Sequence, residues 1–146
     1  LLVSSNSAPM MPTEDSFVQA CLAGDEEGAC ADIDARDGHS AYAGSKRAIT
    51  LWMRRNIVEY AKAGVRMNAV APGITNTPLT EQVYADEQLG GIMREFEETV
   101  PCGGTAQPEQ IASVMRFMLS PEADFVCGSI FFVDGGSDAM MRPDDF

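Results

Sequence analysis

Residues 40–73, SAYAGSKRAITLWMRRNIVEYAKAGVRMNAVAPG, decide the fold class of this chain. Apolar side chains recur at helical spacing over residues 40–63, and Gly64 follows as a residue that commonly ends a helix. Residues 65–71 are rich in β-branched and small apolar side chains, and Pro72-Gly73 bounds them. This stretch therefore predicts one long helix that leads into a buried strand.

Shorter elements are predicted on both sides of this stretch. We expect a strand at 1–3, two short helices within 77–100 interrupted by Gly90-Gly91, a helix over 108–119 and a strand over 129–133. The remaining tail is expected to be irregular. The order strand, helix, strand, helix, helix, strand is typical of an α/β fold with a parallel sheet and crossover helices.

The segment 11–38 does not continue this pattern. It holds eight acidic residues against one basic residue, Arg36, and shows little periodicity. A short helix is expected around residues 17–22. We interpret the segment as a solvated acidic insertion between the first strand and the long helix.

The composition opposes several classes of function. The chain has 146 residues, with 10 basic and 22 acidic side chains and a net charge of −12 at neutral pH. This charge opposes binding to nucleic acid or to an anionic membrane surface. No apolar run approaches the roughly 20 residues of a membrane span, so we expect a cytoplasmic protein. Cys21, Cys30, Cys102 and Cys127 form no CxxC pair, so neither a metal site nor a disulfide framework is expected.

Tyr42 and Lys46 form the first candidate for catalysis. They stand four residues apart in the predicted long helix, which places both side chains on one face about one turn apart. A positive charge near a phenol favours the phenolate and lowers the pKa of the tyrosine, so Tyr42 is expected to exchange a proton near neutral pH. The spacing alone is weak evidence, because a surface tyrosine and lysine give the same pattern.

Three further segments accompany this pair in order along the chain. Ser4-Ser5 follows the first strand, the segment 68–73 with Thr77 follows the long helix, and Val133-Asp134-Gly135-Gly136 closes the series. This set resembles the C-terminal half of the classical short-chain dehydrogenase/reductases over almost the whole chain, apart from the insertion. The resemblance implies that residues 1–146 are the C-terminal part of a single Rossmann-like domain with a doubly wound parallel sheet.

The resemblance implies a catalytic role for three residues. Ser5 matches the serine that hydrogen-bonds the substrate oxygen, with Ser4 as the alternative if the register differs by one. Tyr42 matches the general acid and base, which also contacts the cofactor. Lys46 matches the residue that holds the nicotinamide ribose hydroxyls and lowers the pKa of the tyrosine.

Cofactor and substrate contacts are implied in the same way. Pro72, Gly73 and Ile74 match the loop whose backbone passes the nicotinamide, and the hydroxyl of Thr77 matches a contact to the carboxamide or pyrophosphate. Thr75 stands where many members carry Val or Ile, and it keeps the backbone groups that bind the carboxamide. Residues 77–100 would form a substrate lid, with Leu79 and Met93 in an apolar pocket.

These matches imply an enzyme, an NAD(P)-dependent oxidoreductase that interconverts a secondary alcohol and a ketone. Segments within 41–46, 63–66, 71–79 and 134–143 further resemble the bacterial 3α-hydroxysteroid dehydrogenase/carbonyl reductase subgroup, whose members also carry an insertion before the tyrosine helix. The subgroup implies NAD rather than NADP, and hydroxysteroids or other apolar carbonyl compounds as substrates.

Two alternatives stay open, because the family's glycine-rich turn for the pyrophosphate has no counterpart in this sequence. The chain could be a non-catalytic half-domain, or a subunit that needs a partner chain to bind cofactor. It could also be a 3-oxoacyl thioester reductase. Since the chain begins within a predicted strand, at Leu1, we expect a longer parent polypeptide. We also expect a homo-oligomer, a dimer or tetramer, that uses residues 108–133, because the insertion would partly cover the tyrosine helix.

Overall fold

The computed structural model describes residues 1–87 and 89–145, and its centre is a sheet of parallel strands. The strands are β1 (Leu2–Val3), β2 (Ala69–Pro72) and β3 (Ile130–Val133), in the order β1-β2-β3. The predicted α/β class with a parallel sheet is therefore confirmed. Residue 88 of the predicted lid and residue 146 at the end of the predicted domain lie outside the described residues.

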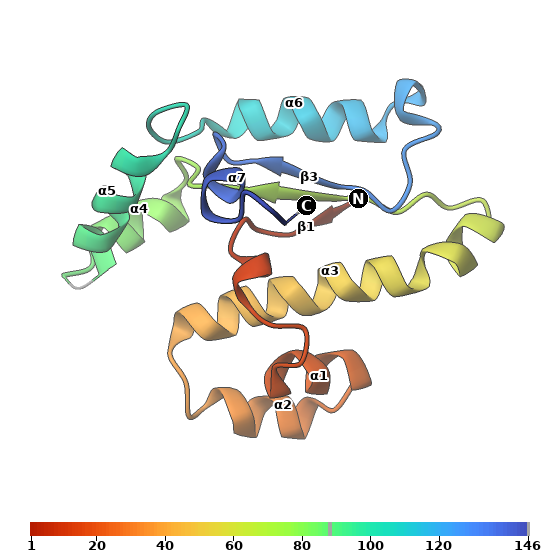
Figure 1. Cartoon of the computed structure of the whole chain (residues 1–146), viewed down its shortest axis with the longest axis horizontal. Coiled ribbons are helices and arrows are strands. Elements are labelled where there is room, and N and C mark those ends of the chain that lie inside the picture. Colours follow the sequence, from red (N-terminus) through yellow and green to blue (C-terminus); the bar gives the residue numbers. More distant parts are fainter. Residues whose placement is uncertain (88, 146) are drawn as a thin grey trace.

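Helices cover both faces of this sheet. The long helix α3 (Gly38–Lys62) lies on one face and α6 (Pro108–Leu119) on the other (Figure 1). Ala69 of β2 packs in a buried cluster with Met53 of α3, whereas Val70 packs in a cluster with the buried side of α6. Because β2 is buried from both faces, its residues form a continuous apolar run rather than an alternating one.

The elements around β2 confirm most of the predicted boundaries. Helix α3 begins two residues before the predicted start, where the carboxylate of Asp37 accepts a hydrogen bond from the backbone N–H of Ser40 at 2.9 Å. Gly64 follows the helix with a φ of +79°, as a terminating glycine should. Strand β2 is shorter than the predicted 65–71, because its register with the two-residue strand β1 begins at Ala69.

The acidic insertion contains more structure than the sequence predicted. Helix α1 (Ser16–Ala23) covers the predicted short helix, but a second helix, α2 (Glu26–Ile33), was not predicted, and both lie beneath α3 (Figure 1). The carboxylates of Asp15 and Asp25 accept backbone N–H groups at the starts of these helices. The acidic residues at 25–27 are typical of a helix N-terminus, which our interpretation as a solvated segment missed.

The two helices of the lid segment are confirmed, but their boundary was predicted wrongly. Helix α4 (Pro78–Ala85) ends before α5 (Leu89–Thr99) begins, and Gly90-Gly91 lies inside α5. A Cβ atom on Gly90 would lie 2.4 Å from the carbonyl oxygen of Tyr84. Gly90 is therefore required by the close approach of α5 to the end of α4, and it does not break the helix.

Three short elements complete the chain: η1 (Ala8–Met10), η2 (Pro121–Ala123) and α7 (Ser137–Met141). The prediction of an irregular tail is wrong at α7. The carboxylate of Asp134 accepts hydrogen bonds from the backbone N–H groups of Gly136 and Asp138 and so starts this helix. Among the described helices, none has both the length and the apolar composition that a membrane crossing requires.

Candidate active site

The polar segments identified in the sequence meet at the carboxyl ends of the parallel strands. Ser4-Ser5 follows β1, Pro72-Gly73 ends β2 and Asp134 follows β3. The backbone N–H of Asn6 donates to the carbonyl of Pro72 at 3.0 Å, which ties the loop after β1 to the end of β2. Helices α4 and α5 stand beyond this edge (Figure 1). In open parallel sheets this edge is where ligands bind.

Tyr42 and Lys46 lie on one face of α3, as their spacing predicts. The Nζ atom of Lys46 lies 5.6 Å from the centroid of the Tyr42 ring. It also donates a hydrogen bond to the backbone carbonyl of Val3 at 3.0 Å. Tyr42 is 45% exposed, so its phenol is accessible to a ligand. The ammonium thus joins the tyrosine helix to β1, two residues before Ser5.

The two neighbouring serines, both buried, have different hydrogen bonds. Thr50 donates its hydroxyl proton to the carbonyl of Lys46 at 2.7 Å, so Ser4 must be the donor in its own 2.7 Å contact with the Thr50 hydroxyl. Ser5 Oγ instead accepts from the backbone N–H and the hydroxyl of Ser7, at 3.2 and 3.0 Å. Among the described hydrogen bonds, the proton of Ser5 has no acceptor, which favours Ser5 over Ser4 as a donor to a ligand.

The loop after β2 is held from one side by Ala106. A bridge pairs Thr75 with Ala106, whose N–H donates to the carbonyl of Ile74 at 2.9 Å and whose carbonyl accepts from the N–H of Asn76 at 2.8 Å. The Thr75 hydroxyl donates to the carbonyl of Gly73 at 3.0 Å. The backbone of residues 73–76 is therefore fixed by hydrogen bonds before any ligand binds.

Two predicted cofactor residues have structural roles of their own. A Cβ atom on Gly73 would lie 2.7 Å from the Cα atom of Asp134, so a glycine is needed where β2 passes the end of β3. Thr77 caps α4, because its hydroxyl accepts from the N–H of Thr80 at 3.3 Å. The Thr77 and Thr80 hydroxyls are 2.9 Å apart, and Thr80 donates to the carbonyl of Thr75 at 2.6 Å. Sequence reasoning did not anticipate the cap.

A cavity of about 180 Å³ lies beside this loop. It is lined by Ile74, Val100, Cys102, Gly103, Gly104, Thr105, Ala106, Gln110, Val133, Asp134 and Gly135. Ile74 is therefore the one predicted site residue in its wall. Leu79, which is 67% exposed on α4, and the partly buried Met93 on α5 are not among the lining residues. A second cavity, of about 290 Å³, lies on α6 and contains none of the predicted residues.

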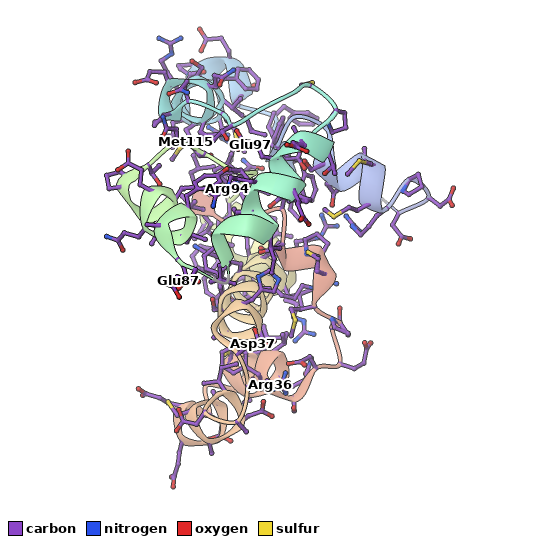
Figure 2. All side chains as sticks on the ribbon, turned by 90° about the vertical axis from the view of Figure 1, so that its left-hand side faces the viewer. Arg36, Asp37, Glu87, Arg94, Glu97 and Met115 are labelled. Carbon is purple, nitrogen blue, oxygen red and sulfur yellow. The ribbon has the colours of Figure 1, made fainter. Side chains whose placement is uncertain are left out.

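One polar cluster at α4 and α5 was not predicted. Glu97 of α5 accepts hydrogen bonds from the hydroxyls of Tyr84 at 2.8 Å and Thr105 at 2.5 Å. These two donors hold the pKa of Glu97 below its ordinary value, whereas burial and the neighbouring carboxylate raise the pKa of Tyr84. Figure 2 shows Glu97 on α5, closer to α6 than Arg94 is. The three residues belong to three different segments, 13 and 8 positions apart, and no local pattern marks them.

The chain is similar to several known proteins. Residues 6–138 match the family model described as enoyl-(acyl carrier protein) reductase. The chain is 38% identical to the 3-alpha-hydroxysteroid dehydrogenase/carbonyl reductase of Comamonas testosteroni, over 100% of this chain and 57% of that protein. It therefore spans a little over half the length of this relative.

Two solved structures extend the comparison. The 3-alpha-hydroxysteroid dehydrogenase from Pseudomonas sp. B-0831, complexed with NADH, matches with a TM-score of 0.90 and 43% identity, over 99% of this chain and 57% of that one. A structure from Agrobacterium tumefaciens with bound NADP matches with a TM-score of 0.59 and 33% identity, over 68% of this chain and 39% of that one.

Proposed function

The chain belongs to the short-chain dehydrogenase/reductase family, and on this basis we propose that the protein interconverts a secondary alcohol and a ketone with a nicotinamide cofactor. One observation carries the proposal. The Lys46 ammonium lies 5.6 Å from the Tyr42 ring and 3.0 Å from the carbonyl of Val3, which brings a proton donor, a cation and the Ser5 segment to one edge of the sheet. This is the set of groups that acid–base catalysis at a carbonyl oxygen needs.

The residues at this edge fit the nicotinamide half of such a cofactor by their chemistry. Lys46 offers an ammonium and Tyr42 a phenol to ribose hydroxyls, while Pro72, Gly73, Ile74 and Thr75 offer backbone groups and Thr77 a hydroxyl. The cofactor, when bound, supplies or accepts the hydride. We propose NAD rather than NADP, because the NADH-bound relative matches this chain over more of its length and with the higher TM-score.

The protein's own residues act on the substrate oxygen. During reduction, negative charge grows on that oxygen, and a donor already in place stabilises it. Ser5 has this role in our proposal, because its proton has no acceptor among the described hydrogen bonds. Tyr42 gives its proton to the same oxygen, and in the reverse direction it accepts the proton. The Nζ atom of Lys46 lies beside the phenol, 5.6 Å from the centroid of its ring.

The substrate class we propose is a hydroxysteroid or another apolar carbonyl compound. The names of the relatives from Comamonas testosteroni and Pseudomonas support it. Leu79 and Met93 place apolar side chains on the lid helices α4 and α5, where such a substrate could contact them. A 3-oxoacyl thioester is the second candidate. The matching family model is described as an enoyl-(acyl carrier protein) reductase, which supports acyl thioesters as a class but names an enoyl group rather than a 3-oxo group. Assays with both substrate classes separate the two.

The test compares two tyrosines of the same helix. We expect Tyr42→Phe to lower kcat/KM for the NADH-coupled reduction of a steroid ketone by roughly 10²- to 10⁴-fold, as loss of a general acid does. Tyr60→Phe is the matched control, because Tyr60 packs edge-on against Trp52 further along α3 and should keep the activity. Equal activity of Tyr42→Phe and the wild type would refute the role of Tyr42.

The mass of the natural gene product should be measured before the kinetics. A heavier polypeptide that turns over substrate supports a complete reductase. A 15.7 kDa product without turnover supports the non-catalytic alternative, and turnover that appears only with a second chain supports the subunit alternative.

Association of copies through residues 108–133 stays a prediction. It is supported by apolar side chains that this segment exposes: Phe117, Leu119 and the fully exposed Phe125. We expect Phe125→Ser to weaken self-association in sedimentation equilibrium. Val58→Ser, at an exposed apolar site on α3, should leave it unchanged. The reverse pattern would place the contact on the tyrosine helix.

A further inference from the structure

Glu97 connects two segments that border the candidate cofactor loop. Its carboxylate accepts from the hydroxyl of Tyr84, in the last turn of α4, at 2.8 Å, and from the hydroxyl of Thr105, in the segment before α6, at 2.5 Å. Each hydroxyl uses a different oxygen of the carboxylate. A hydrogen bond to a charged acceptor is stronger than one between neutral groups, so this carboxylate is an effective link between α4 and the segment before α6.

The link closes a ring of contacts. Thr105 is followed by Ala106, which exchanges backbone hydrogen bonds with Ile74 and Asn76. The carbonyl of Thr75 accepts from Thr80 in the first turn of α4, and α4 leads to Tyr84 in its last turn. Helix α4 is therefore tied to the loop directly at its start and, through Glu97 and Thr105, again at its end.

Polar contacts contribute to the position of this part of the molecule, because few of its side chains are fully buried. None of the described residues of α4 is buried, and among those of α5 only Gly90 is. Besides the Glu97 contact, Arg94 of α5 donates to the carbonyl of Tyr84 at 3.3 Å, and the hydroxyls of Tyr84 and Thr105 lie 3.5 Å apart. Contacts as long as these are weaker than the two short hydrogen bonds to the carboxylate.

We propose that Glu97 is a positioning residue, which holds the loop 74–76 in place for the cofactor by closing this ring. The inference rests on the proposed function, because that function makes the loop a nicotinamide contact. In Glu97→Gln the charge of the carboxylate is lost. The side chain keeps one carbonyl oxygen as acceptor, whereas its amide nitrogen can only donate to the second hydroxyl, so two charge-assisted hydrogen bonds become neutral ones. Tyr84→Phe removes the hydroxyl that donates to Glu97 from α4, and so deletes one of the two links from the donor side.

The experiment measures the loop and the cofactor separately. Hydrogen exchange of the Ala106 and Asn76 amides reports the contacts of the loop, because both N–H groups are donors within the ring. We expect roughly 3- to 10-fold faster exchange in Glu97→Gln, and a similar rise in Kd for NADH by fluorescence titration, as for the loss of charge assistance in two hydrogen bonds. The value of kcat at saturating NADH should change little. Glu98→Gln, an exposed neighbour on the same helix, is the control and should match the wild type.

The double variant with Tyr84→Phe sharpens the test. If Glu97 and Tyr84 act through the same link, the double variant should change the exchange rate and the Kd by less than the product of the two single changes. Unchanged exchange in Glu97→Gln would overturn the inference, and so would faster exchange with an unchanged Kd for NADH. A wild-type protein that neither binds NADH nor turns over a ketone would refute the proposed function instead. If the wild type binds NADH and the variants at Glu97 and Tyr84 match it in exchange and in Kd, only the positioning role is refuted.

Discussion

The two helix pairs beside the candidate site are held in different ways. The pair α1–α2 buries Phe17, Val18 and Ala29, and its ion pairs join Arg36 to Asp15 and Asp32. The pair α4–α5 buries only Gly90 among its described residues and depends on hydrogen bonds around Glu97. Segments with few buried apolar contacts open at a lower free energy than segments within the core. We infer that α1–α2 belongs to the rigid scaffold, whereas α4–α5 can move when a ligand binds.

The scaffold pair contacts the tyrosine helix between the two proposed catalytic residues. A Cβ atom on Gly44 would lie 2.6 Å from Cδ1 of Phe17, so the ring of Phe17 rests directly on the backbone of α3. Gly44 lies between Tyr42 and Lys46 in the sequence. The acidic insertion therefore supports α3 where the position of its side chains matters for the proposed chemistry.

The largest expected effect comes from removing this support. Phe17 is only 8% exposed, and we expect Phe17→Ala to lower the free energy of unfolding by roughly 3–5 kcal/mol, as for other buried aromatic residues. Leu79→Ala in α4 is the matched control, with an expected change within about 0.5 kcal/mol, because Leu79 is exposed. Urea denaturation measures both. Equal losses in the two variants would contradict the distinction between α1–α2 and α4–α5.

A smaller effect is expected when a glycine that contacts α1–α2, and one within α4–α5, is replaced by alanine, which adds one methyl group. Gly44→Ala should destabilise the protein by roughly 1–3 kcal/mol, because the new Cβ atom overlaps the Phe17 ring. Gly91→Ala in α5 should instead stabilise it by up to about 1 kcal/mol, because the described residues place no atom within 4 Å of the new Cβ and alanine favours a helix. Urea denaturation of both variants and of the double variant Gly44→Ala with Phe17→Leu is the measurement. Failure of the smaller side chain to restore stability would show that Phe17 is not the cause.

The sequence predicted those elements whose packing partner is the sheet. Helices α3 and α6 have apolar residues at helical spacing, and the strands β2 and β3 are short continuous apolar runs, because each element packs one side or both sides in the core. Helix α2 buries only Ala29, so no apolar periodicity marks it, and only the acidic residues at its start could have indicated it. Helix α7 depends on a single capping carboxylate, Asp134, and is too short to show a period.

The candidate site was predicted from spacing and resemblance, but its hydrogen bonds were not. Tyr42 and Lys46 could be paired, because four residues on a helix determine a common face. The choice between Ser4 and Ser5 needed Thr50, which lies 46 residues from Ser4. Glu97 and Thr105 meet only because the chain turns back after α5. Contacts of this kind depend on tertiary structure, and a local pattern cannot indicate them.

The smallest expected effect is on how the stability of the protein depends on pH in the acid range. Burial acts to raise the pKa of Asp15, but the hydrogen bond and charge of Arg36, together with the N–H groups of Val18 and Phe17, lower it further than burial raises it. The pKa of this carboxyl is therefore below its unfolded value of about 3.9. Its stabilising contribution is fully present above that value and is lost as the pH falls through the lower, folded value.

We expect Arg36→Met to reduce this acid dependence, because Asp15 then loses the partner that lowers its pKa most. Urea midpoints of the wild type and the variant between about pH 3 and 6 measure the effect, and the two curves should converge at the acid end. Arg55→Met, at an exposed position of α3, is the control and should run parallel to the wild type. Parallel curves for Arg36→Met would mean that the ion pair adds nothing to the scaffold pair. The rigidity of the pair α1–α2 would then depend on the buried side chains of Phe17 and Val18 alone. Apolar burial would be the whole difference between this pair and α4–α5.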